Sequence, residues 1–397
     1  MIHSDASPPP AIELRSSVPA DSSRGFESTQ DDAGTFTNPI APGADPWVVY
    51  HEGFYYWCAS ENDTAVAVYR SERLTERGEK VVVWRAPERG LYSRQIWAPE
   101  LHRLDGRWYI YVAASSGRNE THRMIALESV GEEPTSEFRF KAELYTGDDI
   151  TCGRQNRWAI DGTILEHDAR RYMLWSGWAD ERDVQWLYIA TMSNPWTLSS
   201  NRVRLCANDD FHWERVDETP STRGLNEAPQ VLSRNGRVFV IFSASASWRT
   251  TYKLGLLALT PGSDPMNPRA WTKRREPVFQ STEKTWGVGH CGFTHSPDGA
   301  EDWIVFHAKL ERRANWKRAV HVQRFEWSGE GEPVFGEPVS AGIGVRVPSG
   351  QNGSALPVAL GRAALAAAVG DPPMVQHVTI RHVAASPKSP RETLPRR

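Results

Sequence analysis

The sequence predicts an all-β protein, a five-bladed β-propeller with four-stranded blades around a central channel. Three observations lead to this prediction. Helical periodicity is scarce between residues 38 and 350. Short runs of β-branched and aromatic residues recur there instead, broken by Gly, Asp and Asn, as is typical of strands and turns. Finally, five segments of the 397-residue chain share one strand–turn–strand plan, which indicates a repeat architecture.

Each of the five copies begins with a short apolar strand, passes through a tight turn and ends in an aromatic-rich strand. The copies are DPWVVYHEGFYYWCAS from Asp45, APELHRLDGRWYIYVAAS from Ala98, DGTILEHDARRYMLWSG from Asp161, APQVLSRNGRVFVIFSAS from Ala228 and CGFTHSPDGAEDWIVFHA from Cys291. After each copy the chain has room for two more strands. Four strands in each of five units predict a propeller. Two packed β-domains are the alternative, but they would not explain five copies of one hairpin.

The turns of these hairpins carry a strong local signal. They contain the pairs Glu52-Gly53, Asp105-Gly106, Asp168-Ala169, Asn235-Gly236 and Asp298-Gly299. Asp-Gly and Asn-Gly between apolar runs favour a two-residue hairpin turn, because both central residues need a positive φ. The third copy has alanine at the second position, so we expect a different turn type there.

The propeller is predicted to cover residues 35–350. Residues 1–34 are rich in Ser, Pro and Asp and are expected to form a disordered extension. Residues 351–397 are expected to form an appendage that is partly disordered. The N-terminus has no basic segment followed by an apolar one, so no secretory signal peptide is visible.

Composition excludes several classes of partner. The 46 basic and 49 acidic residues give a net charge of −3, so electrostatics suggest neither nucleic acid nor membrane binding. No apolar run approaches the roughly 18 residues that span a bilayer. The four cysteines (Cys58, Cys152, Cys206, Cys291) are too widely spaced for a metal or disulfide pattern. Most of the 17 tryptophans are expected in the core, while some can offer flat faces to sugar rings.

The residues that open the first strand of each blade are expected to converge on the propeller axis, because that strand lines the channel. They are Asp45, Trp97-Ala98, Asp161, Glu227-Ala228 and His290-Cys291. Taken singly, each has an ordinary explanation, since an Asp before Pro or Gly is usually a turn residue and Glu is usually solvated. Three carboxylates crowded into one cavity repel one another, however, and such an arrangement points to a functional site.

Glycoside hydrolysis is the chemistry that this set of residues supports. It needs one carboxylic acid to protonate the leaving oxygen and one carboxylate to activate water or to attack the sugar. A third carboxylate can raise the pKa of the acid through its negative charge. A tryptophan near the channel, Trp97, would supply a stacking wall.

Five motifs resemble those of a known family. NPIAPGADPWV, IWAPELHRLDGRWYIYVAAS, WAIDGTI, NEAPQVL and GVGHCGFT are similar to the blade-opening motifs of glycoside hydrolase family 43, and most closely to its α-L-arabinofuranosidases, including exo-acting ones. The resemblance runs from about Asn38 to Gly350, and the five motifs stand in order at blade spacing. Two departures occur, because GVGHCGFT has Val288 and Cys291 where Pro and Asn are usual, and Ala228 stands where Gly is frequent.

The resemblance implies roles for individual residues. Asp45 would be the general base that activates water, Glu227 the general acid, and Asp161 the carboxylate that tunes and orients the acid. His290 would be the axial histidine. Some family members hold a calcium or similar ion there, so His290 is also a candidate metal ligand. Substrate-binding residues would be Trp97, His290, Arg318 and Gln323, with a structural salt bridge as the alternative for Arg318.

The expected activity is the inverting removal of terminal α-L-arabinofuranose from arabinan or arabinoxylan. β-Xylosidase or arabinanase activity is the alternative within the same chemistry, and a non-catalytic sugar-binding propeller is a more distant one. A sialidase is not favoured, because no Ser-x-Asp-x-Gly-x-x-Trp repeat is present. The expected partner is a plant cell-wall type oligosaccharide or polysaccharide. No cofactor is required and a monomer is expected; a polymeric substrate would favour an extracellular location.

Overall fold

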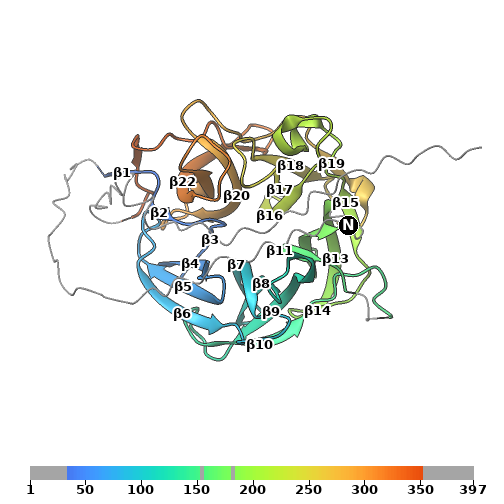
Figure 1. Ribbon diagram of the computed structural model, residues 1–397. Coiled ribbons are helices and arrows are strands. Elements are labelled where there is room, and N and C mark those ends of the chain that lie inside the picture. Colours follow the sequence, from blue (N-terminus) through green and yellow to red (C-terminus); the bar gives the residue numbers. More distant parts are fainter. Residues whose placement is uncertain (1–33, 153–155, 180–183, 352–397) are drawn as a thin grey trace, which may run out of the picture.

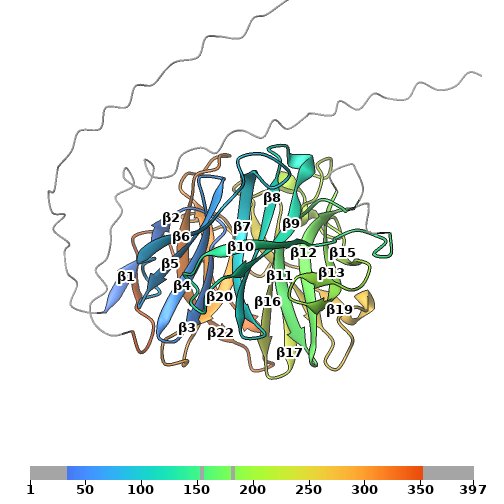
Figure 2. The ribbon, with the colours of Figure 1, turned by 90° about the horizontal axis from the view of Figure 1, so that it is seen from below.

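The computed structural model describes residues 34–152, 156–179 and 184–351, which form a five-bladed β-propeller. The predicted fold class is confirmed. Figure 1 shows the blades arranged in a ring, with β3, β7, β11, β16 and β20 on its inner side, and Figure 2 shows the same strands turned by 90°. The predicted disordered segments, residues 1–34 and 351–397, lie outside the described residues except for Gly34 and Gln351.

Blades 1 and 2 are simple antiparallel sheets of four strands that follow one another outward. Blade 1 consists of β3 (Trp47–His51), β4 (Phe54–Glu61), β5 (Ala65–Ser71) and β6 (Glu79–Arg85). Blade 2 consists of β7 (Arg94–Leu104), β8 (Arg107–Ser115), β9 (Arg123–Ser129) and β10 (Phe138–Glu143), with the 3-10 helix η1 (Asn119–Thr121) between β8 and β9.

Blades 3 and 4 follow the same plan with small additions. Blade 3 consists of β11 (Ala159–His167), β12 (Arg170–Trp178) and β13 (Gln185–Asn194), with β14 (Thr197–Leu198) and β15 (Val203–Cys206) both paired to β13. Two 3-10 helices, η2 (His212–Glu214) and η3 (Val216–Glu218), precede blade 4. Blade 4 consists of β16 (Asn226–Arg234), β17 (Arg237–Ala244), β18 (Lys253–Leu259) and β19 (Trp271–Lys273), with η4 (Pro268–Ala270) before β19.

Blade 5 is built from both ends of the described chain. It consists of β20 (Trp286–His295), β21 (Asp302–Lys309) and β22 (Arg318–Trp327), and the early strand β2 (Ala41–Pro42) pairs with the outer side of β22. The short strand β23 (Pro333–Val334) also pairs with β22, and β1 (Thr35–Thr37) pairs with β24 (Gly344–Arg346). The ring is therefore closed by hydrogen bonds between residues far apart in sequence.

Apolar side chains fill the spaces between neighbouring blades. Five clusters of buried residues lie there, one for each pair of neighbours around the ring. Fully buried tryptophans stand on the second strand of four blades: Trp57, Trp108, Trp175 and Trp303. Within the described residues, no helix has the length and apolar character that crossing a membrane requires.

The hairpin turns differ from the prediction in one respect. Asp168 and Ala169 both have positive φ, 48° and 57°, like the Asp-Gly and Asn-Gly turns of the neighbouring blades. The prediction of a different turn in the third copy was therefore wrong, and alanine occupies the left-handed region there. The fifth copy is the exception instead. The last paired residues of β20 and β21 are His295 and Asp302, so six residues connect these strands rather than two residues. The sequence between these residues, SPDGAE, is simply too long for the tighter turn.

Candidate active site

In each blade, one residue near the start of the innermost strand has a left-handed backbone, and these five residues occupy equivalent positions. They are Asp45, Ala98, Asp161, Ala228 and His290, with φ between 45° and 55°. In blades 2 to 5 the pairing of the innermost strand with its neighbour shifts register across this residue, as in a β-bulge. Bulges re-aim the side chains around them and are common beside active sites. Trp97 and Glu227 each stand one residue before the bulge of their blade.

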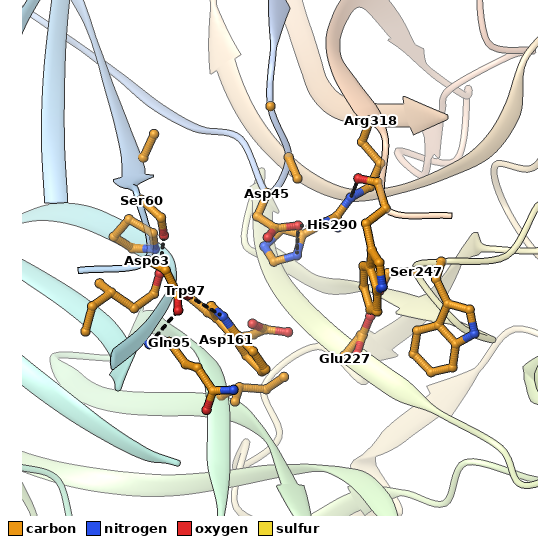
Figure 3. A pocket seen from close by; sticks show the side chains of 18 of the residues that line it. Asp45, Ser60, Asp63, Gln95, Trp97, Asp161, Glu227, Ser247, His290 and Arg318 are labelled. Atoms are coloured by element: carbon orange, nitrogen blue, oxygen red, sulfur yellow. Dashed lines mark hydrogen bonds and ion pairs between the residues drawn. The ribbon is translucent and has the colours of Figure 1, made fainter. Parts of the chain in front are cut away.

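Six of the seven predicted site residues line one cavity of about 410 Å³ (Figure 3). They are Asp45, Trp97, Asp161, Glu227, His290 and Arg318. The cavity is also lined by three more tryptophans, Trp158, Trp248 and Trp316, and by polar residues that the sequence analysis did not single out, among them Asp63, Gln95, Gln185 and Arg223. Carboxylates and aromatic rings in one cavity fit a sugar, which presents hydroxyl groups at its rim and C–H groups on its faces.

Asp45 lies in a positively charged corner of this cavity. Its Oδ1 is 3.2 Å from Arg318 Nη1, 3.2 Å from His290 Nδ1 and 3.2 Å from His307 Nδ1. Burial alone would raise the pKa of Asp45, but the Arg318 guanidinium, His290 and His307 together hold it well below its ordinary value. Burial lowers the pKa of His307 to about 3, so this imidazole is neutral at neutral pH. Asp45 is therefore a carboxylate under ordinary conditions.

Glu227 has surroundings of the opposite kind. Gln185 Nε2 donates to its Oε2 at 2.9 Å, and the Tyr252 hydroxyl donates to its Oε1 at 2.8 Å. Burial raises the pKa of Glu227, and the negative charge of Asp45 adds to this, while the hydrogen bond from Tyr252 works against it. The cavity thus contains one carboxyl group whose pKa is lowered by its neighbours and one whose pKa is raised by burial.

Asp161 is the most deeply buried of the three, with 4% of its surface exposed. Its Oδ2 accepts a hydrogen bond of 3.0 Å from the backbone N–H of Ala228, the residue after Glu227. Burial raises the pKa of Asp161 well above its ordinary value, and the charges of Glu227 and Asp45 raise it further. The bond to Ala228 ties blade 3 to the bulge of blade 4 and so fixes the backbone that carries Glu227.

Trp97 forms a wall of the cavity. Its Nε1 donates to Asp63 Oδ1 at 3.2 Å, and its ring lies on the His122 imidazole with centroids 4.0 Å apart. Burial lowers the pKa of His122 to about 4, so the ring behind Trp97 is uncharged at neutral pH. One edge and one face of the indole are thereby held by the protein.

Gln323 does not line the cavity. Its Nε2 donates to the carbonyls of Phe335 and Glu337, at 3.0 and 3.1 Å, and its Oε1 accepts from the backbone N–H of Val339 at 2.9 Å. The structure therefore contradicts the predicted substrate contact, because Gln323 holds the segment after blade 5. Gln323 lies five residues after Arg318 on β22, which is about 16 Å along an extended strand. Because five is an odd number and side chains alternate along a strand, the two side chains face opposite sides of β22.

The candidate metal ligand His290 has no ligand set around it that fits calcium. In the part of the chain that the structure describes, no group of three or more His, Cys, Asp or Glu side chains is arranged to hold a metal ion. Calcium takes six to eight oxygen ligands, whereas His290 faces Asp45, whose charge is already paired with Arg318.

Several residues around the carboxylates escaped the sequence analysis. Gln185 begins β13 and Tyr252 directly precedes β18, and neither strand belongs to the repeated hairpin. His307 lies in the hairpin of the last copy, within the run Ile304-Val-Phe-His-Ala308, where a histidine among apolar residues was a usable signal.

Comparison with known proteins adds to this geometry. Residues 36–333 match the sequence profile of "Glycosyl hydrolases family 43". The chain is 35% identical over 318 residues to α-L-arabinofuranosidase 43 of Humicola insolens, across 76% of this chain and 63% of that protein. It is 32% identical over 326 residues to an extracellular exo-α-(1→5)-L-arabinofuranosidase of Streptomyces avermitilis, across 78% and 65%. The chain thus spans less than two thirds of the length of these curated relatives.

Among solved structures, the chain is similar to the crystal structure of an α-L-arabinofuranosidase from Lactobacillus brevis. The TM-score is 0.70 at 31% sequence identity, and the superposition covers 78% of this chain and 98% of that one.

Proposed function

The chain belongs to family 43 of the glycosyl hydrolases, and we propose that it removes terminal α-L-arabinofuranosyl residues from arabinan- or arabinoxylan-type polysaccharides with inversion of configuration. One observation carries the proposal. Asp45 and Glu227 share a cavity, and their surroundings move their pKa values in opposite directions. Two carboxyl groups driven apart in this way fit the roles of base and acid.

In the proposed mechanism Asp45 accepts a proton from a water molecule, and the water oxygen attacks the anomeric carbon. The glycosidic C–O bond breaks at the same time, and the leaving oxygen takes the proton of Glu227. Exchange with solvent then returns the proton from Asp45 and restores the proton of Glu227. Arg318 and His290 keep Asp45 ionised between turnovers, because both lie 3.2 Å from its Oδ1.

Asp161 is proposed to favour the protonated form of Glu227. A negative charge beside a carboxyl group raises its pKa, and the two groups are close enough for this, since the charge of Glu227 raises the pKa of Asp161. The hydrogen bond from Ala228 to Asp161 also holds the backbone next to Glu227, which supports an orienting role. Trp97 is proposed as the stacking wall for the sugar.

The choice of arabinofuranose as the substrate sugar rests on similarity to known proteins. The relatives from Humicola insolens and Lactobacillus brevis are named as α-L-arabinofuranosidases, and the one from Streptomyces avermitilis as an exo-α-(1→5)-L-arabinofuranosidase. The match to the Lactobacillus brevis structure covers nearly all of that chain, which supports the same substrate class for the propeller alone.

A direct test is a panel of aryl α-L-arabinofuranosides and β-D-xylosides, with NMR of the first-formed anomer. We expect faster hydrolysis of the arabinofuranosides and initial release of β-L-arabinose. Faster hydrolysis of the xylosides would assign the chain to β-xylosidase activity. Initial release of the α-anomer would overturn the inverting mechanism, and no hydrolysis of either series would favour a binding function.

A further inference from the structure

Three of the four tryptophans that line the cavity are not used by the mechanism, and two of these, Trp248 and Trp316, lie together. Trp248 lies in the connection between β17 and β18, and Trp316 in the connection between β21 and β22. Both side chains are half-buried and line the cavity, with their ring centroids 5.3 Å apart and their planes inclined by 47°. Two loops from different blades thus bring two indoles together beside the catalytic carboxyl groups.

Trp248 lies on the side of the proposed acid, and Trp316 contacts both Trp248 and the Arg318 guanidinium, which is 5.4 Å from the centroid of its ring. Trp248 packs against a small apolar cluster that contains Leu225, two residues before Glu227. Four residues after Trp248, Tyr252 donates its hydroxyl hydrogen bond to the same carboxyl group. The other two cavity tryptophans, Trp97 and Trp158, belong to blades 2 and 3 instead. Because a general acid protonates the leaving oxygen, the sugar that leaves must lie on the acid's side.

A buried lysine joins the two loops that carry this pair. Lys309 ends β21 with 5% of its surface exposed. Its Nζ donates to the Trp248 carbonyl at 3.0 Å, to the Asn315 carbonyl, and to Asn315 Oδ1 at 3.2 Å. The backbone N–H of Asn315 donates to the same Trp248 carbonyl at 3.0 Å. The ammonium group of Lys309 therefore holds the backbone at Trp248 and the backbone at Asn315, next to Trp316.

The surroundings of Lys309 are costly for a cation. All three of these acceptors are uncharged, and burying an ammonium group with neutral partners alone is unfavourable. Burial lowers the pKa of Lys309 to about 7, and the positive charge of Arg318 contributes. A neutral side chain would fill this space at lower cost, so the lysine points to a need for the three bonds that it donates.

We propose that Trp248 and Trp316 form the surface that binds the leaving sugar, the one next to the bond that is cleaved, and that Lys309 is the positioning residue that holds both loops. The inference rests on the proposed function and extends it from the cleaved sugar to its neighbour. Flat aromatic rings suit the C–H face of a sugar ring. The pair therefore favours an oligosaccharide or polysaccharide over a glycoside with a small alkyl group.

The test compares two substrates whose leaving groups have similar basicity. α-1,5-Linked arabinotriose places a sugar on the proposed surface, whereas methyl α-L-arabinofuranoside places only a methyl group near it. In Trp316→Ala and Trp248→Ala we expect kcat/KM for arabinotriose to fall at least about tenfold, as for truncation of an aromatic residue that dominates an interface. We expect kcat/KM for the methyl glycoside to change less than about twofold.

Trp196→Ala is the matched control, because Trp196 is also half-buried but lies in blade 3 against Lys141, away from the residues that line the cavity. It should leave the ratio of the two kcat/KM values unchanged. An equal loss on both substrates in Trp316→Ala and Trp248→Ala would overturn the proposal. If the wild-type protein cleaves neither substrate, the proposed function itself fails, which is a different result.

The positioning role of Lys309 is tested with Lys309→Met and, independently, Asn315→Ala. Both should raise KM for arabinotriose while kcat and the methyl glycoside kinetics stay near wild type. Lys253→Met is the control, since Lys253 is equally buried and loses a bond to Glu218 instead. Thermal unfolding shows whether each variant is folded at the assay temperature. Loss of activity on both substrates in folded Lys309→Met and Asn315→Ala would overturn the positioning role.

Discussion

Asp45 and Glu227 both carry a carboxyl group, and their different surroundings shift the pKa values of the two groups in opposite directions. Asp45 faces a guanidinium and two imidazoles, and these outweigh the effect of burial on its pKa. Glu227 faces an amide and a phenol, and burial outweighs these. A charged partner stabilises a carboxylate far more than a neutral donor does, which is why the pKa values of the two carboxyl groups move apart.

The acid assignment predicts a selective loss in Glu227→Ala. Hydrolysis of polysaccharide should fall by roughly 10²–10⁴-fold, the usual contribution of a general acid. Aryl glycosides with acidic phenol leaving groups need little protonation, so their hydrolysis should keep much of the wild-type rate. Steady-state rates on both substrates check this. Equal losses would count against Glu227 as the acid.

Removing Arg318 should change the pH dependence of activity. The proposed mechanism needs Asp45 ionised, and the Arg318 guanidinium lowers its pKa. In Arg318→Met the pKa of Asp45 should rise, so a smaller fraction is ionised at a given acidic pH. The acidic limb of the kcat/KM profile should therefore move to higher pH, by about one unit or more for a charge at this distance. An unmoved acidic limb would show that Asp45 does not control it.

At the scale of the strands, β20 passes very close to the residues around Glu227. Gly289, one residue before the bulge at His290, has no side chain, and a Cβ added there would overlap the Tyr252 ring. That ring stacks on His307, with centroids 5.5 Å apart, and its hydroxyl bonds Glu227. A methyl group on β20 would therefore act on Glu227, the proposed acid, through Tyr252.

Gly289→Ala should destabilise the protein by about 1–3 kcal/mol, as overpacking of a dense core does, and should also lower kcat. Urea unfolding and steady-state kinetics measure the two effects. Gly329→Ala is the control, because a Cβ at Gly329 meets no atom within 4 Å. Wild-type stability and activity in Gly289→Ala would show that Tyr252 can move without consequence.

The strands also show what the sequence was able to predict. The five left-handed residues lie eight positions before the second turn residue in the first four copies, and nine before it in the last. This nearly constant spacing made Asp45, Asp161 and His290 predictable. Gln185, Tyr252 and the loops with Trp248 and Trp316 lie outside the repeated hairpin. Their place in the cavity depends on how blades pack, which no local pattern encodes.

Gln323 illustrates the opposite error. It was predicted from a resemblance in the motif around Arg318, yet the alternation of side chains along a strand places residues five apart on opposite faces. The motif therefore identifies the right strand, but only Arg318, one of its two predicted site residues, lines the cavity.

At the scale of the whole molecule, stability depends on the closure of the ring. Asn38 binds the backbone of Val322 twice, since its Nδ2 donates to the carbonyl at 2.8 Å and its Oδ1 accepts from the N–H at 2.9 Å. These bonds continue the pairing of β2 with β22. Asn38 is 2% exposed, so water does not easily replace them.

Asn38→Ala should lower the free energy of unfolding by about 2–4 kcal/mol, because two buried backbone groups lose their partners. Urea denaturation measures this. Asn201→Ala is the control, since its side chain accepts one exposed hydrogen bond from Ile150 and should cost less than about 1 kcal/mol. A similar loss in both variants would argue that closure by β2 adds little.

The seam in blade 5 also fixes when the protein becomes active. Asp45 and Arg318 are 273 residues apart and lie on the two sides of that seam. Contacts between such distant residues form late, because a long stretch of chain must be ordered before its ends meet. During synthesis, Asp45 leaves the ribosome long before its cationic partner exists. The proposed base thus gains its cationic partner only when the last blade is complete, and the onset of hydrolysis during refolding reports the final joining of the two ends.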